Sequence, residues 1–257
     1  MADNQYGFPT EVLSLPSKGL LYPEGSPLRS GTIDVKYMTA KEEDILTSVN
    51  LINQGIVIDK LLESVIADSK IKLDDMLVGD KNALMVGTRV LGYGKNYEIS
   101  VLDPDTNERV EYTIDLTSLK HRKINEKVYE NEDTFSFELP NSKRVIGFKL
   151  LTHKDEDEIK QTLKDYEKVE KLTGISQGLS IRMKQSILSV DGNDDRKFIN
   201  DFVDNEFLAL DTRAYRQYVD SITPDIELKF DYMSQTGNQH RLDVPLGIEF
   251  FWPAAGK

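Results

Sequence analysis

The chain has 257 residues and a formal charge of −12, and it contains no cysteine. Disulfides, thiolate zinc sites and cysteine nucleophiles are therefore excluded, and the negative field repels nucleic acids and anionic membranes. The length allows one large domain or two lobes, and without a signal-peptide pattern or an apolar run of roughly 20 residues we expect a soluble protein made in the cytosol.

Residues 1–30 are expected to form an extended N-terminal arm. They hold four of the nine prolines together with scattered Leu, Phe and Tyr. A segment broken in this way cannot build its own core, so its apolar side chains need another surface. We predict that the arm binds a neighbouring subunit through Leu13, Leu15, Leu20 and Tyr22. The alternative is that the arm packs on its own domain.

Residues 31–142 are predicted to form a first α+β lobe. Periodicity and cap signals predict a strand over 32–38, helices over 40–48, 56–67 and 81–91, and hairpins over 97–116 and from 135 onward. The basic run "KHRK" at 120–123 lacks the aromatic residues that stack on bases, so it is expected to lie in a solvated loop.

Residues 143–257 are predicted to form a second α+β lobe. The preceding hairpin turns at 140–142, and helices are expected over 153–172, 179–190, 195–204 and 211–222, followed by a hairpin over 226–246. The tail contains the aromatic run Phe250, Phe251 and Trp252, which we predict to bind a partner, since interfaces favour such residues. The alternative is that the three side chains belong to the core.

The two lobes repeat several motifs in the same order. "VKYMTAKEED" (35–44) returns as "FKLLTHKDED" (148–157), and "INQGIVI" (52–58) returns as "ISQGLSI" (175–181). In the first pair, Thr39 and Thr152 are expected to cap helices, with an acid three residues later. The collinear matches predict an internal duplication. The alternative is that two unrelated segments share the same cap chemistry.

No catalytic or cofactor motif stands out in the chain. There is no nucleophile elbow, Walker loop or dinucleotide fingerprint. "DPDTNE" (103–108) begins like a calcium loop but has Glu108 where the glycine belongs and Ile114 where the bidentate glutamate belongs, so a hairpin tip is predicted. Neither this tip nor the one at 233–237 holds a metal-ligand set. We therefore expect no enzyme activity, no cofactor and no metal.

Several motifs resemble the baseplate hub and hub-assembly proteins of T4-like contractile-tailed bacteriophages. They are "LPSKGLLYPEGSPL", "VKYMTAKEEDILTS", "GIVIDKLLESVI", "VGDKNAL" and "VPLGIEFFWP". Some members of this family carry C-x-x-C pairs at hairpin tips, and this chain departs from them at both tips. The resemblance therefore does not extend to a zinc site.

The resemblance implies a structural component of the tail baseplate hub that binds other phage baseplate or tail proteins. The protein would be assembled in the host cytoplasm and located in the virion, and a symmetric multi-copy assembly is open. One alternative is a transient assembly factor that is absent from the virion. A second is a carboxylate-based hydrolase acting on the cell wall, since the chain holds 44 acidic residues.

Overall fold

The computed structural model describes residues 7–129 and 134–251. It divides into two compact units, and the α+β class predicted from the sequence is confirmed. Unit 1 comprises residues 1–73, 79–122 and 225–257, and unit 2 comprises residues 74–78 and 123–224. This division differs from the predicted lobes, because the C-terminal hairpin belongs to the same unit as the N-terminal arm.

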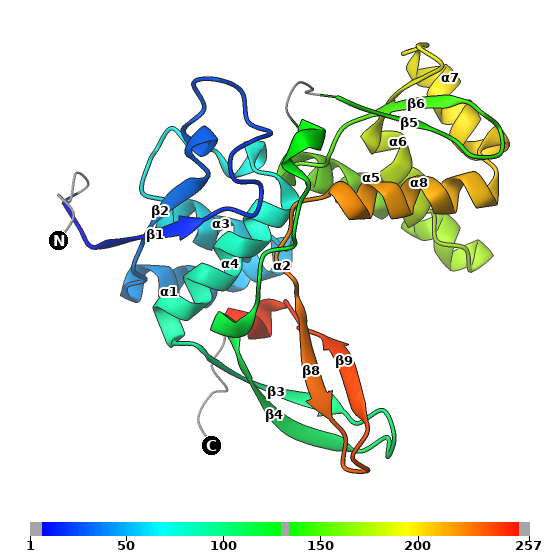
Figure 1. Ribbon diagram of the computed structural model, residues 1–257. Helices are drawn as coiled ribbons and strands as arrows, with labels where there is room; N and C mark the ends of the chain where they lie inside the picture. Colours follow the sequence, from blue (N-terminus) through cyan, green and yellow to red (C-terminus); the bar gives the residue numbers. More distant parts are fainter. Residues whose placement is uncertain (1–6, 130–133, 252–257) are drawn as a thin grey trace. The chain divides into compact units, whose positions relative to one another are not determined.

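Unit 1 contains a small sheet, a group of helices and two hairpins (Figure 1). Its elements are β1 (Thr10–Ser14), η1 (Pro27–Ser30), β2 (Thr32–Lys36), α1 (Ala40–Leu46), α2 (Val49–Gln54), α3 (Val57–Val65), α4 (Val78–Tyr93), β3 (Asn96–Leu102), β4 (Arg109–Asp115), η3 (Leu116–Ser118), β8 (Lys229–Met233), β9 (Gln239–Asp243) and η6 (Ile248–Phe251). The arm thus contributes β1, which pairs antiparallel with β2.

The core of unit 1 follows from the helical period of α3. Leu61, Leu62 and Val65 lie on one face of this helix and are fully buried. Val35 of β2 is also fully buried and forms an isolated bridge with Ile66, immediately after α3. The chain therefore returns to the sheet as soon as the helix ends.

The predicted hairpins of unit 1 are present. β3 pairs with β4 and β8 pairs with β9, each in a separate two-stranded sheet. The basic run at 120–123 is not a free loop, because His121 forms an antiparallel bridge with Ile226. That bridge connects the segment after β4 to the segment before β8.

Unit 2 is a three-stranded antiparallel sheet with helices. Its elements are η4 (Glu126–Tyr129), β5 (Phe135–Glu138), β6 (Val145–Phe148), α5 (His153–Thr173), α6 (Gly178–Ser186), β7 (Ile187–Val190), α7 (Arg196–Asp201), the π-helical turn η5 (Phe202–Glu206) and α8 (Ala209–Ile222). The strand order is β5-β6-β7.

One predicted helix of unit 2 is wrong in its second half. The helix expected over 179–190 ends at Ser186, and the next four residues form β7. Ile187 and Val190 are fully buried against β6, where their β-branched side chains fit the sheet. Pairing with β6 outweighs the local preference to continue the helix.

Both predicted capping boxes are confirmed. Thr39 N–H donates to Glu42 Oε2 (2.9 Å) at the start of α1, and Thr152 N–H donates to Asp155 Oδ2 (3.0 Å) at the start of α5. Each box satisfies amides that have no partner within the helix. Within the described residues, no helix has the length and apolar character needed to span a bilayer.

Candidate functional site

The proline-rich arm packs on unit 1 itself. Leu15 and Tyr22 keep only 1% and 5% of their surface exposed, whereas Leu13 and Leu20 are half-buried. Burying two such side chains stabilises the unit by about 1.5–3 kcal/mol each relative to leaving them exposed. The arm is therefore part of the core of its own unit.

The turn within the arm is fastened by Arg29. Its Nη1 donates to the carbonyl oxygens of Leu20 (2.6 Å) and Tyr22 (3.1 Å). Gly19 adopts φ +78°, and a Cβ at this position would collide with the carbonyl group of Arg29. Glycine is required here because it combines the left-handed conformation with a close backbone approach.

A buried carboxylate holds the same turn from the side of α4. Asp80 is fully buried and accepts hydrogen bonds from Ser17 N–H (2.9 Å), Ser17 Oγ (2.6 Å) and Tyr22 Oη (2.6 Å). Burial raises the pKa of Asp80, although these hydrogen bonds and the nearby His121 oppose the rise. We call Asp80, Ser17 and Tyr22 the unit 1 clasp.

The aromatic residues before the C-terminus are also buried. Phe250 and Phe251 are at most 1% exposed, and the Phe250 ring meets the Tyr97 ring edge-on with centroids 5.0 Å apart. Arg89 Nε donates to the Phe250 carbonyl oxygen (2.8 Å), and burial lowers the pKa of Arg89. Trp252 lies outside the described residues.

The seven predicted partner-binding residues thus fall into three groups. Leu15, Tyr22, Phe250 and Phe251 are buried within unit 1, Leu13 and Leu20 are half-buried, and Trp252 is not described. A partner could touch the buried four only after a rearrangement of the unit. Partner binding by these residues stays a prediction.

The tips of the two hairpins are tied together by carboxylates. Asp103 is fully buried and accepts from Tyr232 Oη (2.8 Å) and Gln235 N–H (2.9 Å). Burial alone would raise the pKa of Asp103, but these and two local backbone hydrogen bonds lower it to about 2. The charged form is therefore the one that the tip stabilises.

A second carboxylate of the same tip makes further cross-hairpin bonds. Asp105 accepts from Ser234 Oγ (2.5 Å), Thr236 Oγ1 and Asn238 Nδ2 (3.0 Å), and His240 Nε2 lies 3.1 Å from its Oδ1. The hydroxyl donors of Ser234 and Thr236 lead the interactions that lower its pKa. Both aspartates are surrounded by hydrogen-bond donors, so their role is to fasten one hairpin to the other.

Unit 2 contains a buried carboxylate of its own. Asp211 of α8 accepts from Asn141 N–H (2.8 Å), Asn141 Nδ2 (2.9 Å) and Ser142 N–H (3.0 Å). Burial alone would raise the pKa of Asp211, but the hydrogen bonds from residues 141 and 142 outweigh it and the pKa is lowered. We call Asp211, Asn141 and Ser142 the unit 2 clasp.

The connection between α5 and α6 exposes apolar side chains that sequence reasoning missed as binding candidates. Leu172, Ile175 and Leu179 are 87%, 68% and 44% exposed. The signal was present in "KLTGISQGL", where apolar residues flank a Gly174 that ends α5 in the left-handed conformation. Apolar residues grouped at the end of a helical hairpin are typical of protein contacts.

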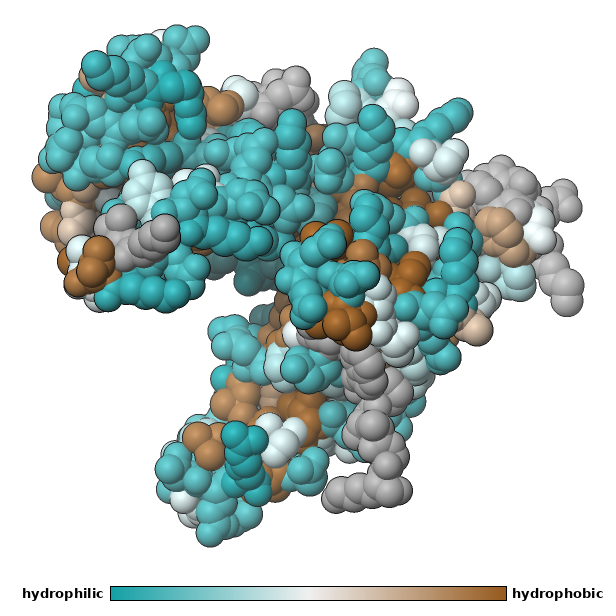
Figure 2. All heavy atoms as spheres, turned by 180° about the vertical axis from the view of Figure 1, so that it is seen from behind, coloured by the Kyte–Doolittle hydropathy of each residue, from teal (hydrophilic) through white to brown (hydrophobic). Residues whose placement is uncertain are grey.

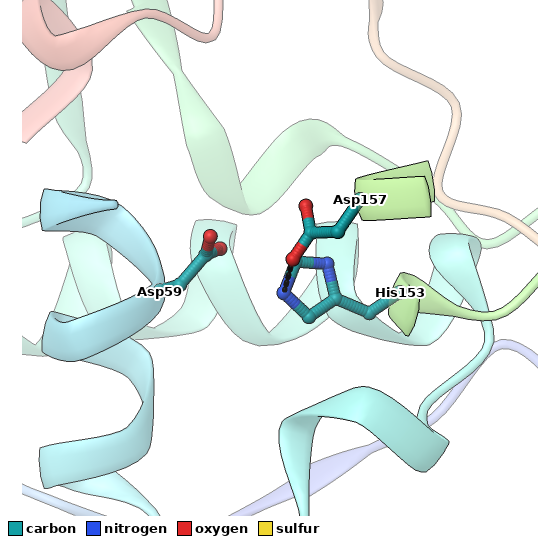
Figure 3. A group of neighbouring side chains, drawn as sticks. All are labelled: Asp59, His153 and Asp157. Carbon is teal, nitrogen blue, oxygen red and sulfur yellow. Dashed lines mark ion pairs between the residues drawn. The ribbon is translucent and has the colours of Figure 1, made fainter. Parts of the chain in front are cut away.

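His153 lies at the first position of α5, as predicted. It is 2% exposed, and its Nε2 lies 3.3 Å from Asp157 Oδ2, one helical turn away. Figure 3 shows the ion pair between these two side chains. The third residue drawn there, Asp59, belongs to α3 of unit 1, where it pairs with Lys81 (2.5 Å).

Comparison with known families decides what kind of protein carries these features. The model of the T4 bacteriophage base plate protein family matches residues 15–252, from the buried leucine of the arm to the aromatic tail. The chain belongs to this family. No curated protein and no solved structure matches it.

Membership of the baseplate family locates the protein at the virion tail and associates it with other phage baseplate proteins. The matched range includes β2 and α1, both clasps and both hairpins that meet at their tips. The contacts described above are therefore features of a baseplate protein. They fasten turns to helices in both units and one hairpin to the other in unit 1.

Proposed function

We propose that this baseplate protein is a non-enzymatic structural component of the hub, which binds other baseplate or tail proteins. The observation that carries the proposal is the family match over residues 15–252. The buried carboxylates agree with it, because Asp80, Asp103 and Asp211 each accept hydrogen bonds that hold a turn or a hairpin in place.

The contact surfaces in this proposal include the predicted arm and tail residues and the exposed end of the α5–α6 connection. Leu13 and Leu20 keep part of their surface accessible in the arm, and Leu172 and Ile175 are largely exposed in unit 2. A net charge of −12 favours a partner with a basic surface around its apolar contact.

Mass spectrometry of purified virions and of precursor baseplates tests this function. A structural subunit is expected in both kinds of particle at a constant ratio to the other baseplate proteins. Detection in precursors alone would establish a transient assembly factor instead. Absence from both would refute the hub proposal.

The proposal of no enzyme activity has a separate test. Purified protein incubated with cell-wall peptidoglycan should release no soluble fragments. Release that disappears when one specific Asp or Glu is replaced by its amide would establish the carboxylate-based hydrolase instead.

A further inference from the structure

The two hairpins of unit 1 enclose a groove. Their inner faces meet where the Tyr112 ring stacks on the Phe230 ring, with centroids 5.2 Å apart. Beside this contact, a groove of about 570 Å³ opens between β4 and β8. Most of its lining residues are polar or charged, and Leu119 is among the few apolar ones. Figure 2 shows hydrophobic side chains among hydrophilic ones on one face of the hairpins.

The edge of β4 that borders the groove has backbone groups with which no strand pairs among the described residues. Leu116 N–H donates to Lys95 C=O (2.9 Å), so Ile114, two residues earlier, belongs to the next hydrogen-bonded pair with β3. Thr113 and Asp115 therefore direct their backbone N–H and C=O groups away from β3, and the Asp115 carbonyl accepts a hydrogen bond from Ser118 Oγ (2.7 Å). Both Thr113 and Asp115 line the groove.

The edge of β8 borders the groove from the other side. Val244 N–H donates to Leu228 C=O (2.9 Å), which sets the alternation along this hairpin. Lys229 and Asp231 consequently direct their backbone groups away from β9, and both line the groove. The Asp231 carbonyl accepts a hydrogen bond from Tyr112 Oη (3.1 Å). Among the described residues, no strand pairs with the outer edge of β4 or of β8.

The groove is closed at one end by direct pairing of the same two chain segments. His121 bridges Ile226, and Glu227 N–H donates to Lys120 C=O (2.7 Å). Between β4 and this bridge, the 3-10 helix η3 (Leu116–Ser118) interrupts the extended chain. The groove therefore begins where the antiparallel pairing of the two segments stops, and a strand from another protein would continue the same kind of pairing.

The charges around the groove cancel, although the chain as a whole is strongly acidic. Three acids and three bases line it, namely Asp115, Glu227, Asp231, Lys120, Lys229 and Arg241. Glu227 and Arg241 already form an ion pair with each other (2.5 Å). A neutral groove gives no electrostatic preference for a charged ligand, so recognition must come from backbone hydrogen bonds and apolar contact.

We propose that the groove between β4 and β8 binds an extended segment of another baseplate protein, which pairs with the outward backbone groups of Thr113 and Lys229 and with the Asp115 N–H. The inference rests on the proposed function for the identity of its partner. Strand addition uses main-chain hydrogen bonds for affinity and alternate side chains for specificity. An uncharged segment that places an apolar side chain beside Tyr112 and Leu119 fits the neutral rim.

Hydrogen exchange in assembled particles tests the proposal. The amides of residues 113, 115 and 229 are expected to exchange at least tenfold more slowly in purified precursor baseplates than in the free chain. Unchanged exchange of these amides would overturn the assignment of the groove as a strand-binding site. A groove that binds only a small molecule would give the same unchanged exchange and is therefore excluded by the expected result. The same protection in a concentrated solution of the chain alone would also overturn it, because the occupant would then be a second copy.

Phage carrying edge variants supply a second measurement. Thr113→Pro removes an outward N–H without removing a bond to β3, and at least a tenfold loss of incorporation into particles is expected. Ser100→Pro is the matched control, because the register also points its amide outward but on the far edge of β3. If Thr113→Pro does not fold, Leu119→Glu in the lining replaces it. Equal incorporation of the edge variant and the control would overturn the proposal.

The two proposals fail in distinguishable ways. Absence of the wild-type chain from every particle refutes the hub function and with it the baseplate partner. Presence of the chain together with unprotected amides at residues 113, 115 and 229 refutes the groove alone.

Discussion

Each unit places one buried aspartate in the first turn of a helix against a turn that begins Leu-Pro, but the donors differ. In the unit 1 clasp, hydroxyl groups supply two of the three hydrogen bonds to Asp80. In the unit 2 clasp, amide groups supply all three bonds to Asp211. The pKa is raised in Asp80 and lowered in Asp211, so the surroundings disfavour the charged form of Asp80 and favour that of Asp211.

The surroundings of the two clasps correspond closely. Leu15 and Leu139 precede the two prolines and are both fully buried. Lys18 and Lys143 then adopt positive φ values of 53° and 60°, and each turn joins two antiparallel strands. Correspondence in strand pairing, turn conformation and helix position supports the predicted duplication.

The side chains that pack between strand and helix next to each clasp differ in size. In unit 1, Leu13 lies against Gly87 of α4, where an added Cβ would collide with Leu13 Cδ1. In unit 2, the Phe137 ring stacks on the Tyr218 ring of α8, with centroids 4.6 Å apart. A close backbone approach in one unit is replaced by an aromatic pair in the other, while the clasp above it is retained.

The largest expected effects come from the two buried leucines. Leu15→Ala and Leu139→Ala should each destabilise the protein by about 2–5 kcal/mol, because each leaves a cavity in a core. Urea unfolding measures the loss, and hydrogen exchange identifies which unit loosens. Leu172→Ala, at a position 87% exposed, is the control and should change little. A negligible cost for either core variant would contradict the equivalence of the two turns.

The aspartates should respond differently to removal of their charge. Asp211→Asn is expected to cost about 1–3 kcal/mol, because its amide NH2 group would face a backbone N–H, which can donate a hydrogen bond but cannot accept one. Asp80→Asn should change stability little, because the hydroxyls of Ser17 and Tyr22 can rotate to accept. Equal losses in urea unfolding would show that donor type does not distinguish the clasps.

Much of this comparison was accessible from the sequence, but the clasps were not. Repeated motifs and cap signals predicted the helix starts at residues 40 and 153, because those interactions are local. The contact between Ser17 and Asp80 joins positions 63 residues apart, and that between Asn141 and Asp211 joins positions 70 apart. Periodicity cannot pair such residues. It equally could not predict β7, whose strand conformation depends on its pairing with β6.

The charges of Asp211 and Asp80 should contribute to the free energy of unfolding with opposite signs, and the pH dependence of Asp211→Asn and Asp80→Asn tests this. A lowered pKa means that the charge of Asp211 stabilises the fold above the ordinary value of 3.8, and that this contribution disappears as the pH falls through the folded pKa. The cost of Asp211→Asn should therefore shrink in acid. Asp80 has a raised pKa, so its charge opposes folding at high pH and the penalty fades as the pH falls. Any benefit of Asp80→Asn should accordingly be largest at high pH, as measured by urea unfolding across pH.

The smallest contrast concerns the two serines of the turns. Ser17→Ala removes the Oγ that donates to Asp80 (2.6 Å) and accepts from Gly19 N–H (3.1 Å), so a loss of about 1–2 kcal/mol is expected. Ser142 reaches Asp211 through its backbone amide, and its buried Oγ makes no hydrogen bond of standard geometry among the described residues, although this side chain helps to lower the pKa of Asp211. Ser142→Ala should therefore cost less than Ser17→Ala, since it removes a hydroxyl without a well-formed hydrogen bond and leaves the backbone donor of the clasp in place. Urea unfolding of the two variants side by side measures the difference, and a Ser142→Ala cost as large as that of Ser17→Ala would mean that the unit 2 clasp also depends on a hydroxyl.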